Sequence, residues 1–187
     1  MSDHFEELGP APRLLHGGFG LLTIGNLRKP RCWALALAQA LGTDLVHLNL
    51  QGDGANSLID GWATRKPDGS IDLLLWNGTL DQSRQEGYEL LKRQLDIHFE
   101  QLANHPYLVS IARVDIEHSN IASYWNRENH DDAWPTAEQW EMLRTADKLD
   151  ETTLPPIVPI EGNTHLALDL PMPGIIRIRL IPQKRTA

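Results

Sequence analysis

Ser2-Asp3-His4-Phe5-Glu6-Glu7-Leu8-Gly9 opens the chain, and a loop with Pro10 and Pro12 leads from it to Leu15-His16-Gly17-Gly18-Phe19-Gly20-Leu21. Acidic residues and a phenylalanine come first, a glycine-rich apolar turn follows, and no apolar run precedes them that could form a core. A globular domain rarely begins this way, because its first elements need a hydrophobic partner to cover them. We therefore expect these residues to belong to the interior of a larger fold.

Several segments occur in an order that is similar to one enzyme family. They are Ser2 to Glu7, His16 to Leu21, Lys29-Pro30, Asp115 to Asn120 and Trp134 to Trp140. These segments resemble the S-D-x-F-E-E, H-G-G-F-G-L, K-P, D-x-x-H-S-N and P-T-x-E-Q-W segments of glycoside hydrolase family 39, which contains β-xylosidases and α-L-iduronidases. Several motifs in the right order are a strong signal, whereas a glycine-rich turn alone would be a weak one.

The resemblance implies a fold. In this family the first segment ends the eighth strand of a (β/α)8 barrel, and the helix that begins near K-P closes the barrel. Residues 1–42 are then the last strand, loop and helix of a barrel, and residues 43–187 a C-terminal β-sandwich domain. A barrel alone takes roughly 250 residues, and this chain has 187. We therefore expect a truncated or split protein that holds only the C-terminal part of the family's architecture.

The resemblance also implies a sugar site without its catalytic centre. Family members hydrolyse β-xylosides with retention, which requires two carboxylates about 5 to 5.5 Å apart, and by resemblance the nucleophile and the acid/base both lie upstream of Met1. Phe5, Glu6 and Glu7 match residues that face the pocket, so the resemblance assigns them to binding the sugar, with no metal and no cofactor. Without the resemblance, the same residues are typical of a solvated acidic chain end.

Composition narrows the class of partner. The formal net charge of −8 disfavours nucleic acid and anionic membranes and favours a neutral partner such as a sugar. Cys32 is the single cysteine, which excludes an internal disulfide, and it lies in an apolar helical run where it packs as a small hydrophobe. No apolar run approaches the ~20 residues of a membrane span. No signal peptide is visible, so we expect a cytoplasmic protein.

One helix is predicted close to the start of the chain. Pro30 suits a first helical turn, Trp33, Leu37 and Leu41 recur at helical spacing, and Gly42 supplies a stop, so the pattern predicts a helix over residues 30 to 41. This helix is apolar nearly all round and needs cover on more than one side. We expect that cover to come from a separate barrel chain or from self-association through residues 1–41.

From residue 43 the apolar period changes from helical to two, which places the domain boundary near Gly42. Alternation predicts short strands over residues 58–64, 71–76, 95–99, 107–114, 166–170 and 175–181. The turn Lys66-Pro67-Asp68-Gly69 makes the first two a hairpin, and Pro155, Pro156 and Pro159 predict an extended crossing. Short strands at this spacing are typical of an antiparallel β-sandwich, and the fold class is therefore mostly β.

Three local patterns give further expectations. Thr136 and Gln139 have the spacing of a capping box, which predicts a short helix near residues 136–147. Arg177 and Arg179 alternate with apolar residues, which predicts that one face of the last strand is solvated. Asn77-Gly78-Thr79 fits an N-glycosylation acceptor, although nothing in the sequence indicates secretion.

Polar residues gather between residues 113 and 125. Asp115, Glu117 and His118 have the chemistry of metal ligands, and Asp115, His118 and Ser119 contain the groups of a catalytic triad. A metal site would need a further ligand, and neighbours along one strand point to opposite faces, which does not suit a triad. We favour a hydrogen-bonded turn that joins the sandwich to the barrel.

Two functional hypotheses follow. In the first, the chain is the C-terminal part of a β-xylosidase-like retaining glycoside hydrolase and is inactive alone. In the second, it is a stand-alone β-sandwich that binds carbohydrate or another protein through exposed tryptophans, drawn from Trp62, Trp76, Trp125, Trp134 and Trp140. Tryptophans inside strands and helices are more often part of the core, which favours the first hypothesis.

Overall fold

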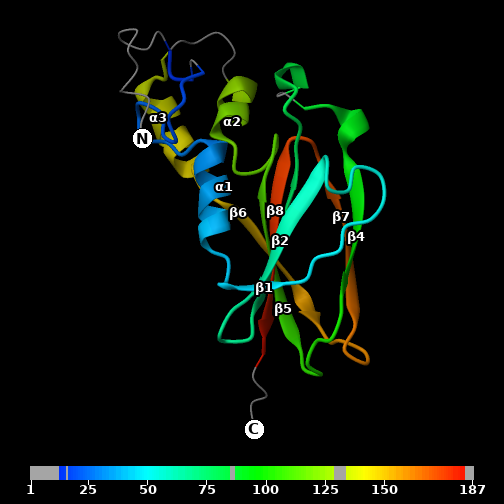
Figure 1. Cartoon of the computed structure of the whole chain (residues 1–187). Helices are drawn as coiled ribbons and strands as arrows, with labels where there is room; N and C mark the ends of the chain where they lie inside the picture. Colours follow the sequence, from blue (N-terminus) through cyan, green and yellow to red (C-terminus); the bar gives the residue numbers. More distant parts are fainter. Residues whose placement is uncertain (1–12, 16, 85–86, 129–133, 184–187) are drawn as a thin grey trace. The chain divides into compact units, whose positions relative to one another are not determined.

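The computed structural model describes residues 13–15, 17–84, 87–128 and 134–183 (Figure 1). The chain divides into two compact units, each built from two segments. The first unit is Met1–Ala36 with Val114–Asp150, and the second is Leu37–Arg113 with Glu151–Ala187. This division differs from the predicted boundary near Gly42, because residues 114–150 group with the start of the chain. The assignment of residues 1–42 to a barrel and 43–187 to a sandwich stays a prediction.

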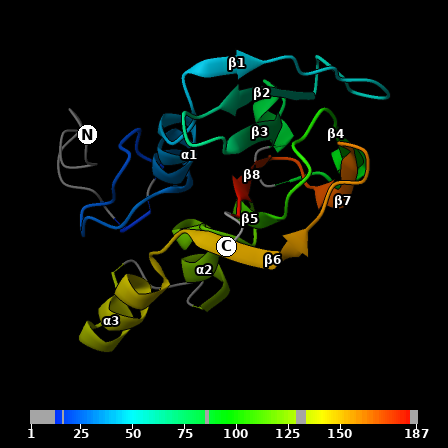
Figure 2. The same ribbon diagram turned by 90° about the horizontal axis from the view of Figure 1, so that it is seen from below.

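The second unit contains two antiparallel layers. One is a six-stranded sheet in the order β1-β2-β3-β8-β5-β6, and the other pairs β4 with β7. The strand bounds are β1 Asp44–Val46, β2 Ile59–Arg65, β3 Ile71–Asn77, β4 Arg93–Phe99, β5 Tyr107–Val114, β6 Asp150–Ile157, β7 Thr164–Leu170 and β8 Gly174–Pro182. Figure 2 shows β4 and β7 together on one side of the larger sheet. The predicted antiparallel β-sandwich is confirmed.

Alternation along the strands places the core between the two layers. Ile59 and Ala63 of β2, Leu73 and Leu75 of β3, and Ile176, Ile178 and Leu180 of β8 belong to one buried cluster. Leu95, Ile97 and Phe99 of β4 pack against that cluster from the opposite layer. The period of two seen in the sequence is therefore the period of inward-facing side chains.

The predicted hairpin is confirmed in detail. β2 and β3 pair antiparallel with Arg65 opposite Ile71, and the N–H of Gly69 donates to the carbonyl of Lys66 at 2.9 Å. Gly69 has a φ of +84°, a conformation that favours glycine. The backbone N–H of Ser70 donates to the carboxylate of Asp68 and holds the pKa of that group below its usual value.

The segment with two adjacent prolines is a strand rather than a simple crossing. β6 contains Pro155 and Pro156, and it lies at the edge of the six-stranded sheet. Proline lacks the N–H that a central strand must donate on both sides, so an edge is where a sheet tolerates it. The extended conformation predicted for this segment is correct, and the structure adds its pairing.

The predicted solvated face of the last strand is wrong. β8 lies between β3 and β5, and Arg177 is only 7% exposed. Asp72 of β3 is fully buried and accepts from Arg179 at 2.7 Å and 3.1 Å, while Arg177 Nε lies 4.0 Å from the same carboxylate. Arg177 also donates to Glu151 at 3.0 Å. Arginines that alternate with apolar residues predict a solvent-exposed face only when no acidic residue on a neighbouring strand neutralises them.

Asn77 connects the two layers of the sandwich. It ends β3, is buried, and donates its side-chain amide to the carbonyls of Leu91 and Leu170 at 2.8 Å and 3.1 Å. Leu170 ends β7, and Leu91 ends the 3-10 turn η3 Glu89–Leu91. A second 3-10 turn, η2 Gln82–Arg84, precedes it in the same connection.

Three helices are described: α1 Pro30–Gln39, α2 Ile121–Glu128 and α3 Ala137–Ala146. The predictions of α1 and α3 are confirmed, and Thr136 and Gln139 form both hydrogen bonds of the capping box. Helix α2 was not predicted from the sequence. In the first unit, Leu14, Leu27, Ile121, Trp125 and Leu143 form a second buried cluster, which holds α2 and α3 to the loop before α1.

We expect the Asp72→Asn variant to lower the free energy of unfolding by about 3 to 5 kcal/mol, because breaking a buried ion pair leaves charge uncompensated in the core. Chemical denaturation checks this value. Asp53→Asn is the matched control: it makes the same change in an exposed acid that lies 2.7 Å from Arg93. A solvated pair of this kind contributes about 0 to 1 kcal/mol. Equal losses in the two variants would contradict the assignment of Asp72 as the buried counter-charge.

Candidate functional site

The residues assigned to the sugar pocket, Phe5, Glu6 and Glu7, lie outside the described residues. The structure describes the segment that follows them. Lys29 is buried and donates from Nζ to the carbonyl of Gly18 at 2.8 Å, and Arg31 donates to the carbonyl of Phe19 at 2.9 Å. These bonds tie the glycine-rich segment to the start of α1. Two cationic side chains therefore set the path of residues 18–31 into the first helix.

The cluster around Asp115 forms the predicted hydrogen-bonded turn. The carboxylate of Asp115 accepts from the backbone N–H groups of Glu117 and His118 at 2.8 Å and 2.9 Å, and it lies 2.8 Å from Nδ1 of His118. The N–H of Asp115 donates to the carbonyl of His118 at 3.0 Å. Asp115 therefore shapes the connection after β5, and its carboxylate is committed to neighbours within three residues.

Ser119 and Asn120 complete this connection. Ser119 has a φ of +50° and accepts at Oγ from the N–H of Asp150 at 2.8 Å, which holds the start of β6 beside the turn. Asn120 accepts from the N–H of Ser123 at 3.1 Å, the bond of a helix N-cap, and donates to the carbonyl of Asp115 at 2.9 Å. The D-x-x-H-S-N segment thus ends a strand and begins a helix.

The hydrogen bonds described at this turn serve the backbone and support neither a triad nor a metal ion. Asp115 lies beside His118, and the hydroxyl oxygen of Ser119 accepts from the backbone N–H of Asp150. Among the described residues, no group of three or more His, Cys, Asp or Glu side chains is arranged to hold a metal ion.

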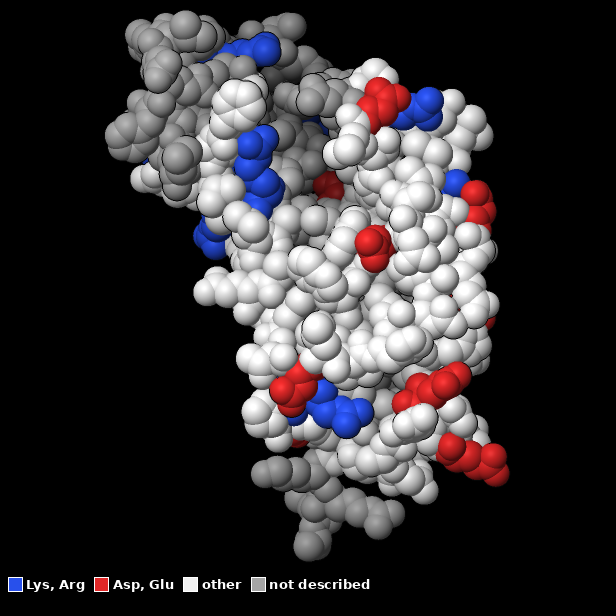
Figure 3. Space-filling model, viewed as in Figure 1, with Lys and Arg blue, Asp and Glu red and all other residues white. Residues whose placement is uncertain are grey.

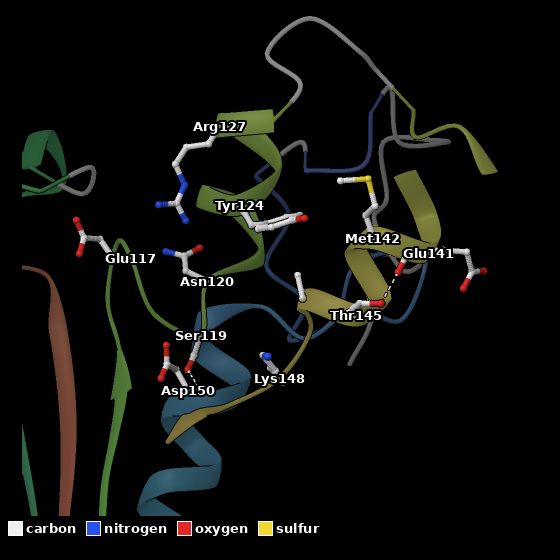
Figure 4. A pocket seen from close by; sticks show the side chains of 11 residues that line it. Glu117, Ser119, Asn120, Tyr124, Arg127, Glu141, Met142, Thr145, Lys148 and Asp150 are labelled. Carbon is white, nitrogen blue, oxygen red and sulfur yellow. Dashed lines mark hydrogen bonds between the residues drawn. The ribbon is translucent and has the colours of Figure 1, made fainter. Parts of the chain in front are cut away.

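An open groove of about 550 Å³ lies between α2 and α3 in the first unit (Figure 4). Its walls include Asn120 just before α2, Tyr124 and Arg127 from α2, and Met142 from α3, with Lys148 beyond that helix. The groove also carries acids, but Figure 4 shows them dispersed along its length rather than paired. They do not form the close carboxylate pair that glycoside hydrolysis with retention requires.

This groove was not predicted from the sequence, because α2 was not predicted. Asn120, Tyr124 and Arg127 are spaced by four and three residues, so they line one face once the helix exists. The sequence does contain one signal for this helix: Asn120, a residue type favoured at helix N-caps, stands directly before the Ile-Ala-Ser-Tyr-Trp run. Trp125 of α2 is buried, so it cannot be one of the tryptophans predicted to stack on a sugar.

None of the helices in the described ranges has the length and apolar character that a membrane crossing needs.

Comparison with solved structures supports the fold. The enzyme of this glycoside hydrolase family from Xanthomonas axonopodis pv. citri superposes with a TM-score of 0.75 at 18% identity, over 97% of this chain and 36% of that chain. A monomeric β-xylosidase from Caulobacter crescentus CB15 superposes with a TM-score of 0.71 at 20% identity, over 98% of this chain and 36% of that chain. The chain therefore spans about a third of the length of these two enzymes.

Sequence comparison gives the family. A β-xylosidase from Geobacillus stearothermophilus is 37% identical over 81 residues, which make up 43% of this chain and 14% of that protein. The family model described as glycosyl hydrolases family 39 matches residues 1–164. This match covers most of the chain and includes both the opening acidic segment and the Asp115 turn, so the chain belongs to glycosyl hydrolases family 39.

Proposed function

We propose that this chain acts as the C-terminal part of a retaining glycoside hydrolase that cleaves β-xylosides. The observation that carries the proposal is the family match over residues 1–164 in a chain about a third as long as the solved relatives. The nucleophile and the acid/base then belong to the barrel, which corresponds to the length that this chain does not span. The chain supplies part of the sugar site and the sandwich domain.

Phe5, Glu6 and Glu7 are the proposed contribution to the sugar site. In a (β/α)8 enzyme, residues at the C-terminal ends of the strands reach the active site. The family's F-E-E segment occupies such a position, and its place just before the glycine-rich segment is kept here. The bonds from Lys29 and Arg31 to Gly18 and Phe19 show that the glycine-rich segment has a defined path into α1, which supports the proposal.

The proposed partner is a barrel that covers residues 1–41, supplied by a separate chain or by a longer protein. Helix α1 buries Trp33 and Leu37, but Leu35 on another side of the helix is 57% exposed. Phe19, before the helix, is also exposed. Exposed apolar residues on an almost wholly apolar helix favour association with a further hydrophobic surface.

We expect the purified chain to release no aryl leaving group from an aryl β-xyloside, because neither proposed catalytic carboxylate is present. A chromogenic assay measures this, with a complete family 39 β-xylosidase as the positive control. Turnover that persists through purification and disappears in Glu6→Gln would overturn the proposal, since it would place a catalytic carboxylate within this chain.

In a full-length family 39 enzyme that carries this segment, we expect Glu6→Ala or Glu7→Ala to lower kcat/KM by about tenfold to a hundredfold. Charge-assisted hydrogen bonds contribute about 1.5 to 3 kcal/mol, which corresponds to that range of rates. The loss should exceed the change in substrate binding, because contacts to the sugar strengthen as the ring approaches an oxocarbenium-like transition state.

Steady-state kinetics of the two variants check this expectation. Glu89→Ala, which removes an exposed acid on η3, is the matched control and should leave kcat/KM unchanged. Wild-type kinetics in both test variants would show that the opening acids are a solvated segment outside the sugar pocket.

A further inference from the structure

The outer face of the smaller sheet brings two histidines together. Leu95, Ile97 and Phe99 of β4 pack against the core, so the alternating residues of this strand face outward. β4 and β7 pair antiparallel with His98 directly opposite His165, and both side chains are exposed. The centroids of the two rings are 5.9 Å apart and their planes meet at 27°. Two strands that are distant in the sequence therefore place two imidazoles side by side.

The distance between the two rings suits a shared metal ion. Imidazole nitrogens coordinate zinc at about 2.0 to 2.1 Å, so an ion in the plane of both rings, with an angle of about 90° to 180° at the metal, separates the ring centroids by about 4.5 to 6.4 Å. The centroids of His98 and His165 fall within this range. Rotation about each Cβ–Cγ bond leaves the centroids almost in place, and exposed side chains rotate freely. Such rotation can direct one nitrogen of each ring to a common point.

Asp96 orients one of the two rings. Nε2 of His98 lies 3.0 Å from the carboxylate of Asp96, and the small Ala167 opposite Asp96 leaves that carboxylate room to follow the ring. An ionised carboxylate only accepts hydrogen bonds, so the neutral imidazole donates from Nε2 and keeps its lone pair on Nδ1. Histidines that bind metals usually donate their other ring N–H in this way. Nδ1 of His98 is therefore the nitrogen available to a metal ion.

The surroundings of the pair favour a cation. A hollow of about 370 Å³ contains both histidines and is also lined by Glu100, Asn163 and Thr164, which offer oxygen atoms and no positive charge. Residues 94–112 and 157–170 contain neither lysine nor arginine. Figure 3 shows acidic side chains, without a basic one, over the lower ends of β4 and β7 in that view. A negative local potential attracts cations and disfavours anions.

The ligand atoms select the class of ion. Imidazole suits zinc, copper and nickel, whereas magnesium and calcium require oxygen ligands. Within the part of the chain that the structure describes, no third His, Cys, Asp or Glu side chain is arranged with the two histidines. Water then completes the coordination shell. Closed structural zinc sites use four protein ligands, so a site with two is open to solvent and exchanges its ion.

We propose that His98 and His165 form a binding site for a divalent transition-metal ion, represented by zinc, and that Asp96 is a positioning residue for the first of these rings. An ion held by both imidazoles connects β4 to β7 in the two-stranded layer of the sandwich. Because the two rings are adjacent only in the folded chain, the ion stabilises the fold. The site lies in the second unit and uses none of the residues proposed for the sugar pocket, so it goes beyond the proposed function.

Isothermal calorimetry with zinc chloride on the purified, tag-free chain tests the proposal. Outer-shell partners of a metal site contribute about 10- to 100-fold to affinity. We therefore expect His98→Ala and His165→Ala, which remove a ligand, each to weaken zinc binding about a hundredfold or more, and Asp96→Ala to weaken it about tenfold. Zinc should raise the Tm of the unchanged chain but not that of the two histidine variants. Circular dichroism without metal establishes that each variant is folded.

His47→Ala is the matched control. His47 is an exposed histidine of the same unit that lies just after β1, outside the strand pairing. This variant should bind zinc as the unchanged chain does. Magnesium chloride should cause neither binding nor a rise in Tm, because its ion prefers oxygen ligands.

Four results would overturn the proposal. The first is no saturable binding up to on the order of 1 mM zinc, and the second is equal weakening in His47→Ala. The third is undiminished binding in folded His98→Ala and His165→Ala. The fourth is an equal response to magnesium, which would assign the binding to the exposed acids instead.

Discussion

The fully buried carboxylate of Asp72 supplies the negative charge that lets two arginines lie in the central strands of the sandwich. Asp72 on β3 neutralises Arg179 on β8 and approaches Arg177, while Arg179 also donates to the carbonyl of Ala40, just after α1. Replacing such a network by hydrophobic residues is often neutral for stability, so its effect on specificity is the more informative aspect. A slip of one residue between β3 and β8 would turn both arginines into the hydrophobic core. The network thus excludes the wrong registers of a strand that is otherwise almost wholly apolar.

The Asp115 segment illustrates how a motif rich in catalytic residue types can be structural. Asp115 accepts local N–H groups, Ser119 anchors the beginning of β6, and Asn120 caps α2. Each polar side chain thereby satisfies a backbone group that the change from strand to helix leaves without a partner. In this chain the segment therefore has a structural role in the change of direction from strand to helix.

The alternating segments predicted the sandwich well, since Ile71 to Trp76 or Leu95 to Phe99 can bury one face only as strands. The capping box at Thr136 likewise predicted where α3 begins.

The pairing of strands could not be predicted from the sequence: β7 and β8 follow each other in the chain yet lie in different sheets. The burial of Arg177 depends on Asp72, which lies more than a hundred residues away in the sequence. Helix α2 was not predicted because its short apolar stripe directly follows a polar turn, so its helical period is hard to separate from that turn. Phe5, Glu6 and Glu7 were assigned by family resemblance alone, and they lie outside the described residues.

The buried amide of Asn77 has a consequence for how the protein is produced. Asn77-Gly78-Thr79 is an acceptor sequence for N-linked glycans, yet in the folded chain both donor positions of that amide are occupied by carbonyls of Leu91 and Leu170. Enzymes of the endoplasmic reticulum act on chains as they emerge, before such bonds form. A glycan attached at that moment would separate β3 from the ends of β7 and η3 and hold the two layers apart. Hosts that lack this modification avoid that competition between glycosylation and closure of the sandwich.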